Sequence, residues 1–413
     1  MTPQNILFIL LAILLVNFIL DQVIDFSNFK WIGKKVPDTV SDVYEEEKYA
    51  TSQAYQRENA KFSFLTNTIS FGLFFVVIAF GVLGKADTYI TTNFTDNTIL
   101  RALIFFGAAF VINDIITLPF DYYATFVIEE KYGFNKMTLK TFIGDKLKGY
   151  LLMAVIGGGL IAILLYFITA IGENFWLYFW VVISILVLSI NMFYTSLIVP
   201  LFNKLTPLED GELRTAIEAY AKKIDFPLTD VYVIDGSKRS TKANAYFSGI
   251  GPKKKIVLFD TLIKNHSIEE LVGILAHEVG HFKKKHIVYG FVLSIVQIGI
   301  TLFILSKFIF NENLSIALGA QDLSYHLNLI AFSMLYAPIS QIIGILMNLF
   351  SRKNEYEADK YAGKTYNPEH LKTALKKLSA DNLSNLTPHP AYVFMHYSHP
   401  PLTKRLEALD KIK

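Results

Sequence analysis

Seven long runs of apolar residues alternate with polar segments along the chain. A transmembrane helix needs about 20 predominantly apolar residues, and each run is close to that length. We therefore predict membrane-spanning helices near residues 4–20, 64–84, 99–120, 150–171, 175–201, 286–310 and 325–350. No Lys or Arg precedes the first run and no small-residue cleavage site follows it. It is therefore predicted to be a retained span rather than a signal peptide.

The basic residues between these runs predict the orientation of the chain in the membrane. Residues 21–63 carry six Lys or Arg and residues 121–149 carry five, whereas the alternate loops carry few or none. Because basic loops stay in the cytoplasm, the N-terminus is predicted to lie outside the cell or in a lumen. The polar segment 202–285 and the tail 351–413 are then both cytoplasmic.

The polar segment 202–285 has a mixed pattern. A helix is predicted over 208–224, followed by two β-branched strands, T-D-V-Y-V-I-D and K-I-V-L-F-D. Between them lies Ala243-Asn244-Ala245-Tyr246-Phe247, which is predicted to form an edge strand. The exposed edge of a sheet can pair with an extended peptide through main-chain hydrogen bonds. In the tail, helices are predicted near 352–365 and 368–383.

Candidate chemistry lies at the end of the polar segment, in the sequence His277-Glu278-Val279-Gly280-His281. Ser267 and Glu270 predict a capping box, so a helix is expected to begin there. Positions four apart lie on one face of a helix, so His277 and His281 can bind one metal ion. Glu278 lies beside the first ligand and is the candidate general base. This is the H-E-x-x-H arrangement of zinc hydrolases.

A third ligand must come from another part of the chain, because a catalytic zinc site uses three protein ligands and leaves one position open. Two further spans separate His277 from the tail, so the tail returns to the same side of the membrane. There, Glu355 and Asp359 share a helical face, and Glu355 is the candidate third ligand. Asp359 is predicted to accept the free N–H of a ligand histidine and thereby fix its tautomer. Glu357 is predicted to be an exposed charge.

Composition narrows the class of protein. Of the 413 residues, 52% are hydrophobic, which is too apolar for a soluble protein of this length. The net charge of +3 gives no electrostatic case for nucleic-acid binding. Cysteine is absent, so a metal here must use histidine and carboxylate ligands.

Several stretches resemble the type I CAAX prenyl proteases, integral-membrane zinc metalloproteases that process isoprenylated proteins. The stretches occur in the family's order and are K-Y-G-F-N at 131–135, A-N-A-Y-F-S-G at 243–249, K-I-V-L-F-D-T-L at 255–262, H-E-V-G-H at 277–281, S-R-K-N-E-Y-E-A-D at 351–359 and H-Y-S-H-P-P-L at 396–402.

The resemblance implies a mostly α, polytopic fold. Seven transmembrane helices would enclose a water-filled chamber, closed on the cytoplasmic side by a small α+β zincin-like protease domain. We place a five-span N-terminal membrane domain at 1–203. The zinc metalloprotease domain, with spans six and seven, is placed at 204–413.

The resemblance also implies roles for single residues. One Zn²⁺ per chain would be bound by His277, His281 and Glu355, with Glu278 as general base. Asn244 would lie at the substrate-binding edge. His399 would hold the developing oxyanion, although by itself this histidine before two prolines suggests only a structural turn.

Three functions stay open. We favour an endopeptidase that cuts near the C-terminus of membrane-associated proteins or peptides, with isoprenylation of the substrate left open. A second is a membrane quality-control metalloprotease for misfolded proteins. A third is a non-enzymatic transporter or scaffold with a structural zinc, against which the co-facial Glu355 argues. The compact loops favour a bacterial plasma membrane; a eukaryotic protein would belong in the endoplasmic reticulum. The physiological substrate and the oligomeric state are not predicted.

One acid inside a span and five further histidines are predicted to have structural rather than catalytic roles. Asp114 is an acid well inside the third span, which a wet chamber would tolerate without a catalytic role. Five histidines without a motif are predicted to be membrane-boundary or surface residues: His286, His326, His370, His389 and His396.

Overall fold

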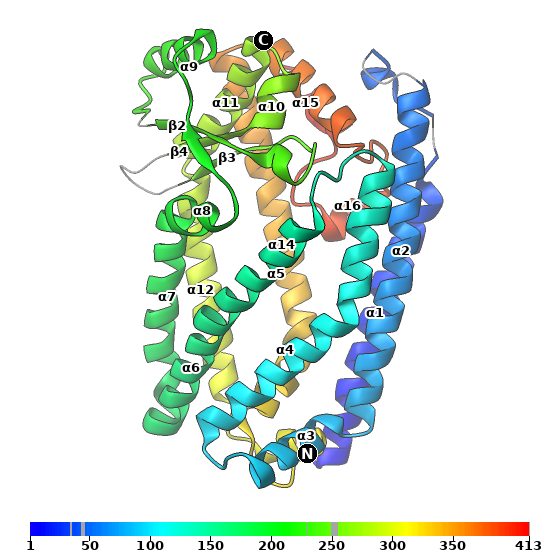
Figure 1. Cartoon of the computed structure of the whole chain (residues 1–413), viewed down its shortest axis with the longest axis vertical. Coiled ribbons are helices and arrows are strands. Elements are labelled where there is room, and N and C mark those ends of the chain that lie inside the picture. The colour runs from blue at the N-terminus through cyan, green and yellow to red at the C-terminus, as the bar shows by residue number, and fades with distance from the viewer. Residues whose placement is uncertain (34, 43–45, 229, 249–254, 413) are drawn as a thin grey trace.

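The structure is a computed structural model that describes residues 1–33, 35–42, 46–228, 230–248 and 255–412. Three residues counted or quoted above lie outside these ranges: Lys34, one of the six basic residues of 21–63, Thr229 and Gly249. The molecule is elongated, with its N-terminus at one end and its C-terminus at the other (Figure 1).

The N-terminal half is helical. Its helices are α1 (Pro3–Trp31), α2 (Glu46–Ala79), α3 (Val82–Asn93), α4 (Thr98–Tyr123), α5 (Leu139–Leu152), α6 (Gly158–Ile171), α7 (Phe175–Phe193) and α8 (Val199–Phe202). Short π-helical and 3-10 turns join some of them, including η2 (Ala124–Glu129) after α4 and η4 (Gly172–Asn174) between α6 and α7.

The C-terminal half contains the strands and the remaining helices. They are β1 (Leu205–Pro207), α9 (Glu212–Lys223), β2 (Asp230–Ile234), β3 (Ala245–Ser248), β4 (Lys255–Phe259), α10 (Asp260–Asn265), α11 (Ile268–Lys283), α12 (His286–Ser306), α13 (Glu312–Ala317), α14 (Tyr325–Thr365), α15 (Pro368–Asp381), α16 (Pro390–His396) and α17 (Leu402–Leu409).

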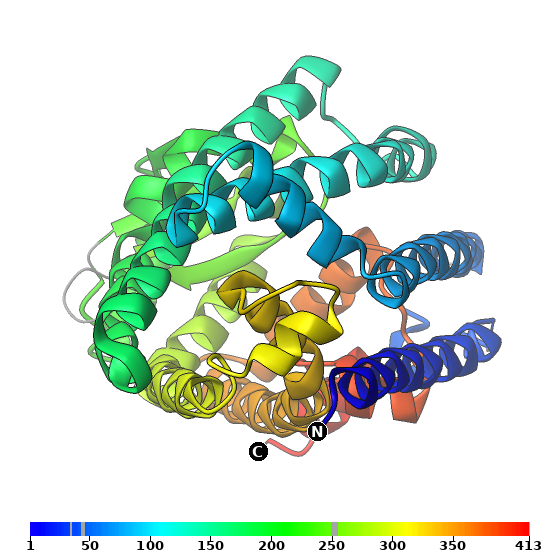
Figure 2. The same cartoon turned by 90° about the horizontal axis from the view of Figure 1, so that it is seen from below.

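Six continuous helical stretches of the described chain are long and apolar enough to cross a membrane. The fourth runs from Leu139 to Phe202 and contains two of the predicted spans, which turn back on each other at η4. The mostly α, polytopic fold predicted from the sequence is thus confirmed. Viewed along the long axis, the helices form a ring in which α1 and α2 are neighbours and α7 lies beside α12 (Figure 2). The predicted chamber stays a prediction.

Helix α14 connects the membrane to the extramembrane domain without a break. It is 41 residues long, so the last predicted span and the predicted helix near 352–365 are one helix. No glycine or proline lies between residues 345 and 362 to end it. Buried Ala358 and Ala362 hold its polar end in the domain core.

The four strands form one sheet in the order β1-β2-β4-β3. Strands β2 and β4 are parallel, and β1 and β3 pair antiparallel at the two edges. The predicted edge strand is therefore confirmed as β3. Strand β1 was not predicted, because it has three residues and ends in Pro207, a residue that sheets accept only at an edge.

The extramembrane core packs around α11. Leu271, Leu275 and Val279 are each at most 2% exposed and pack with the sheet, α9 and α15. The predicted helix over 208–224 begins four residues later, at Glu212. This core holds α11 between the sheet and α14.

Candidate metal and catalytic site

Helix α11 presents the H-E-x-x-H sequence from a well-anchored start. The Glu270 backbone N–H donates to Ser267 Oγ, and the Ser267 N–H donates to Glu270 Oε2 at 3.1 Å. The predicted capping box is thereby confirmed. It satisfies two backbone donors that the first turn of a helix would otherwise leave unpaired.

Helix α11 crosses α14 at a point where both backbones come unusually close. A Cβ on Gly280 would lie only 2.9 Å from Ala358 Cα. A larger residue at Gly280 would therefore push the two helices apart. The close crossing brings the histidines of α11 to the face of α14 that carries Glu355.

The two histidines and Glu355 converge on one point. Glu355 Oε1 lies 3.2 Å from His281 Nε2, and Glu355 Oε2 lies 3.4 Å from His277 Nε2. The two Nε2 atoms are 3.1 Å apart. Among the described residues, this is the cluster of histidines and carboxylates whose ligand atoms all lie within 4.8 Å.

The donor set suits a divalent metal such as zinc, which takes imidazole nitrogen and carboxylate oxygen in a tetrahedral arrangement. Glu355 is 4% exposed, and its Oε2 has no hydrogen-bond partner within the described chain. Arg405 Nη1 and His277 Nε2 each lie 3.4 Å from this oxygen without forming a hydrogen bond to it, and a buried carboxylate oxygen in that state is costly unless a cation binds it more closely. The residues therefore fit a metal ion.

Asp359 and Arg405 support the first histidine. Asp359 Oδ1 lies 2.8 Å from His277 Nδ1, and the Arg405 guanidinium donates to both oxygens of Asp359 at 2.8 and 2.6 Å. Arg405 Nη1 is also 3.4 Å from Glu355. Burial and Arg405 lower the pKa of His277, but the nearby carboxylates of Asp359 and Glu355 outweigh both and raise it to about 9.

Arg405 is absent from the sequence prediction, although a local signal exists. It lies on α17 with Leu402, Leu406 and Leu409, the apolar stripe of an amphipathic helix. An arginine on such a stripe must find a buried partner. Here the partner is Asp359.

The second histidine has a support of the same kind. His281 Nδ1 lies 3.1 Å from His286 Nδ1, and His286 Nε2 lies 3.3 Å from Glu357 Oε2. If His286 donates to Glu357, its Nδ1 accepts from His281, and His281 Nε2 is left free to bind a metal. His286 is the first residue of α12, a position that fits the boundary interpretation, but it is not a surface residue, because it is 7% exposed. Glu357, predicted to be only an exposed charge, is partly covered and hydrogen-bonded.

Glu278, Asn244 and His399 lie around the same cavity of about 420 Å³, which β3, α11, α14 and the C-terminal region line. Asn244 and His399 are exposed, and His399 Nε2 lies 3.4 Å from Glu355 Oε1. Burial raises the pKa of Glu278 despite the opposing effect of the nearby histidines. The structure thus brings together all seven predicted site residues, while their individual roles stay predictions.

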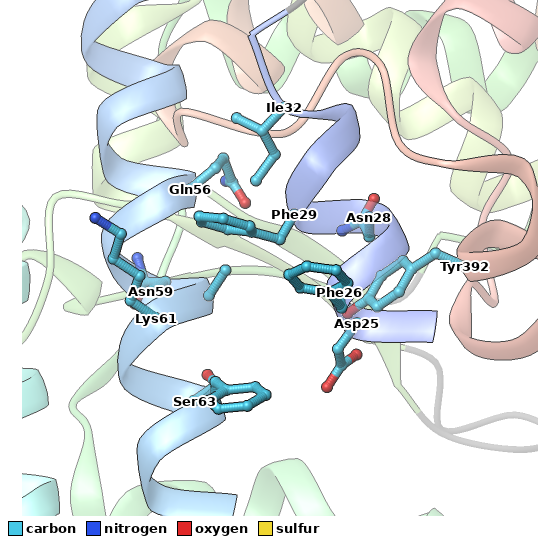
Figure 3. Close-up of a pocket in the computed structure, with 12 residues that line it drawn as sticks. Asp25, Phe26, Asn28, Phe29, Ile32, Gln56, Asn59, Lys61, Ser63 and Tyr392 are labelled. Carbon is cyan, nitrogen blue, oxygen red and sulfur yellow. The ribbon is translucent and has the colours of Figure 1, made fainter. Parts of the chain in front are cut away.

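A second cavity lies apart from this cluster, between α1, α2 and α16. It has a volume of about 560 Å³ and aromatic walls that include Phe26, Phe29 and Tyr392 (Figure 3). None of the predicted site residues lines it. The smaller cavity is therefore the candidate site, because the histidines and carboxylates converge there and not at the larger cavity.

Two residues remote from the site have structural partners. Asp114 forms an ion pair with Lys146 at 2.8 Å and accepts a hydrogen bond from Tyr150. His326 is 2% exposed, and its Nε2 lies 2.9 Å from Asp87 Oδ1. His326 lies at the start of α14, a position that fits the boundary interpretation, but it is not a surface residue, because Asp87 and the ring of Phe105 enclose it.

Comparison with known proteins gives matches along almost the whole chain. Residues 26–204 match the family described as CAAX prenyl protease N-terminal, five membrane helices, and residues 207–413 match Peptidase family M48. The chain is 38% identical over 387 residues to CAAX prenyl protease 1 homolog of Oryza sativa, covering 91% of this chain and 90% of that protein. It is 32% identical over 424 residues to CAAX prenyl protease 1 homolog of Homo sapiens, covering 92% and 89%.

A solved structure is equally similar. The crystal structure of S. mikatae Ste24p superimposes with a TM-score of 0.92 at 32% identity and covers 98% of this chain and 99% of that one. The fold and the order of the sequence motifs therefore agree with the same group of proteins.

Proposed function

The chain belongs to the CAAX prenyl protease family of M48 peptidases, multi-pass membrane metalloendopeptidases, and we propose that it cleaves peptide bonds near the C-terminus of isoprenylated, membrane-associated proteins. The observation that carries the proposal is the convergence of His277, His281 and Glu355 beside Glu278 in one cavity. A structural metal site does not need a general base at its rim. The names of the relatives supply the substrate class.

We assign the metal as one zinc ion per chain, held by His277, His281 and Glu355. Asp359 and Arg405 orient His277, and His286 orients His281. When bound, zinc supplies a Lewis acid that lowers the pKa of water and polarises the scissile carbonyl. The absence of cysteine restricts the ligands to nitrogen and oxygen.

The remaining steps belong to the side chains. Glu278 accepts a proton from the attacking water and returns it to the leaving amine. Its burial favours this role, because a raised pKa brings a carboxylate closer to neutral pH. His399 donates to the carbonyl oxygen as that oxygen gains charge.

Asn244 and β3 would bind the substrate. Strand β3 is at the edge of the sheet, and residues 244–247 line the cavity beside Glu278. An extended peptide can pair with this edge and present one of its bonds to Glu278. Asn244, being exposed, can donate to the main chain of the peptide.

The proposed orientation places the active site and the C-terminus in the cytoplasm and the N-terminus on the other side. The N-terminus and the protease domain lie at opposite ends of the molecule (Figure 1), which supports the opposite locations derived from the basic loops. The bacterial source stays a prediction.

The test uses detergent-purified protein and two C-terminal peptides that differ only in a farnesyl group, with Glu278→Gln as the inactive control. Cleavage of the farnesylated peptide alone is the expected result. Equal cleavage of both peptides would replace the prenyl-protein role with general membrane proteolysis. No cleavage and no zinc would favour the transporter or scaffold.

A further inference from the structure

The K-Y-G-F-N loop at 131–135 has no part in the chemistry described so far, yet it contacts the segment that leads into β3. The Lys136 N–H donates to Arg239 O at 3.0 Å, and the Thr241 N–H donates to Phe134 O at 3.0 Å. Asn135 and Ser240 form an antiparallel β-bridge between these two bonds. The loop of the membrane domain thus pairs with the protease domain as a short strand would.

Lys242 anchors this contact through its side chain. Its Nζ lies 2.8 Å from Glu129 Oε2 and donates to the Tyr55 hydroxyl at 2.9 Å. The same ammonium lies 4.5 Å from the centroid of the Phe134 ring. Tyr55 and Phe134 are 7% and 3% exposed, so α2, η2 and the loop together form a seat around the lysine.

The seat holds a cation. Burial lowers the pKa of Lys242, but the hydrogen bonds with Glu129 and Tyr55 outweigh burial and raise it. A charged ammonium beside a carboxylate and over an aromatic face is a geometrically selective contact. It fixes the position of the ammonium, while the Lys242 side chain as a whole is 36% exposed.

Backbone hydrogen bonds at Lys242 and the two residues after it connect the lysine to the start of β3, the proposed substrate-binding edge. The Ala243 N–H donates to Asn382 Oδ1 at 3.1 Å, and Thr261 Oγ1 donates to the carbonyl of Lys242 at 3.0 Å. Asn244 follows immediately, and its carbonyl accepts from the Phe259 N–H at 3.1 Å. The start of β3 is therefore held from α2, α10, β4 and Asn382, the residue that follows α15.

We propose that Lys242, seated on Tyr55, Glu129 and Phe134, is a positioning residue for substrate binding that sets where the β3 edge begins. The proposal rests on the proposed function, because it requires a peptide that pairs with β3. Lys242 is not among the residues that line the catalytic cavity, so its effect on substrate passes through Asn244 and the strand.

A position-setting role and a merely stabilising role make different predictions. Displacing β3 changes the geometry of peptide pairing but leaves the metal ligands on α11 and α14 in place. A loss of substrate binding raises KM while kcat changes little. A loss of stability lowers the melting temperature and the amount of active enzyme, and it leaves KM unchanged.

The test compares Lys242→Met with Lys242→Arg and with Lys131→Met, a matched control in the K-Y-G-F-N loop. Lys131 loses the same charge, but its side chain is 59% exposed and its partner Glu58 also bonds Tyr132. A tenfold rise in KM corresponds to about 1.4 kcal/mol of lost substrate binding. We expect that rise for Lys242→Met, zinc content equal to wild type, partial recovery in Lys242→Arg and no change in Lys131→Met.

Two further measurements keep the test decisive. The first is the affinity for the peptide, measured on the Glu278→Gln background, which does not require hydrolysis. If the wild-type enzyme proved inactive, the proposed function would be overturned, but the effect of Lys242 on peptide binding could still be measured. If Lys242→Met does not fold, Phe134→Leu tests the same seat by removing the aromatic face. An unchanged KM and peptide affinity in the folded variants would overturn the proposal, as would an equal effect of Lys131→Met.

Discussion

Asp359 Oδ1 and His277 Nδ1 lie 2.8 Å apart, although the two residues are on different helices, on either side of two membrane-spanning segments. This contact turns His277 Nε2 toward Glu355. Arg405 in turn holds the carboxylate of Asp359 through two hydrogen bonds. The orientation of a proposed metal ligand therefore depends on the last helix of the chain.

Asp359→Asn is expected to weaken metal binding. The amide keeps the shape but replaces the carboxylate that fixes the histidine tautomer, and changes of this kind cost about 10- to 100-fold in metal affinity. Competition with a chelator measures the effect. Asp410→Asn, which removes an exposed partner of Lys372, is the control and should leave affinity unchanged.

His286→Phe should also weaken the metal site, through His281. The ring fills the same buried space but cannot accept from His281 Nδ1. A faster loss of metal to chelator is expected, with a smaller effect for Glu357→Gln, whose side chain is 40% exposed. Unchanged metal retention in His286→Phe would contradict the orienting role.

Arg405→Met should destabilise the extramembrane domain by about 3 kcal/mol or more, because it removes the guanidinium that donates to both oxygens of the buried Asp359 carboxylate. Thermal unfolding in detergent measures the change. Arg214→Met, which breaks the exposed ion pairs with Asp210 and Glu218 and one hydrogen bond to Leu208 O, should shift the midpoint little. Equal shifts in the two variants would show that the buried Arg405–Asp359 pair stabilises the domain no more than an exposed ion pair does.

Metal binding should release a proton. The pKa of His277 is raised to about 9, so at neutral pH a metal must displace a proton from this ring. Affinity should rise by about tenfold per pH unit between about pH 6 and 8 and level off above pH 9. Metal competition at several pH values measures the slope, and a flat profile would show that His277 is already neutral.

The sequence identifies features that local spacing controls. His277 and His281 are four residues apart on a capped helix, and Glu355 and Asp359 are four apart on another, so each pair could be predicted. In the sequence, β3 lies between two strands that are more apolar, and this difference predicts an edge position for β3. The membrane spans follow from long apolar runs, whose lengths the bilayer dictates.

Features that depend on distant contacts could not be predicted in the same way. His286 looks like an ordinary residue at the start of a span, and only the fold brings it to His281. The K-Y-G-F-N loop carries no chemistry of its own, and its contact with Lys242 joins segments more than 100 residues apart. For Arg405, the sequence could predict burial, because its helix is amphipathic, but it could not predict the partner, because Asp359 lies on α14.

The central claim is that Glu355 completes a metal site at which Glu278 acts as the base. The most direct test measures zinc content and peptide hydrolysis together in Glu355→Ala and Glu278→Gln. We predict that Glu278→Gln keeps one zinc per chain and loses hydrolysis, whereas Glu355→Ala loses both. Full zinc retention with wild-type hydrolysis in Glu355→Ala would contradict the account.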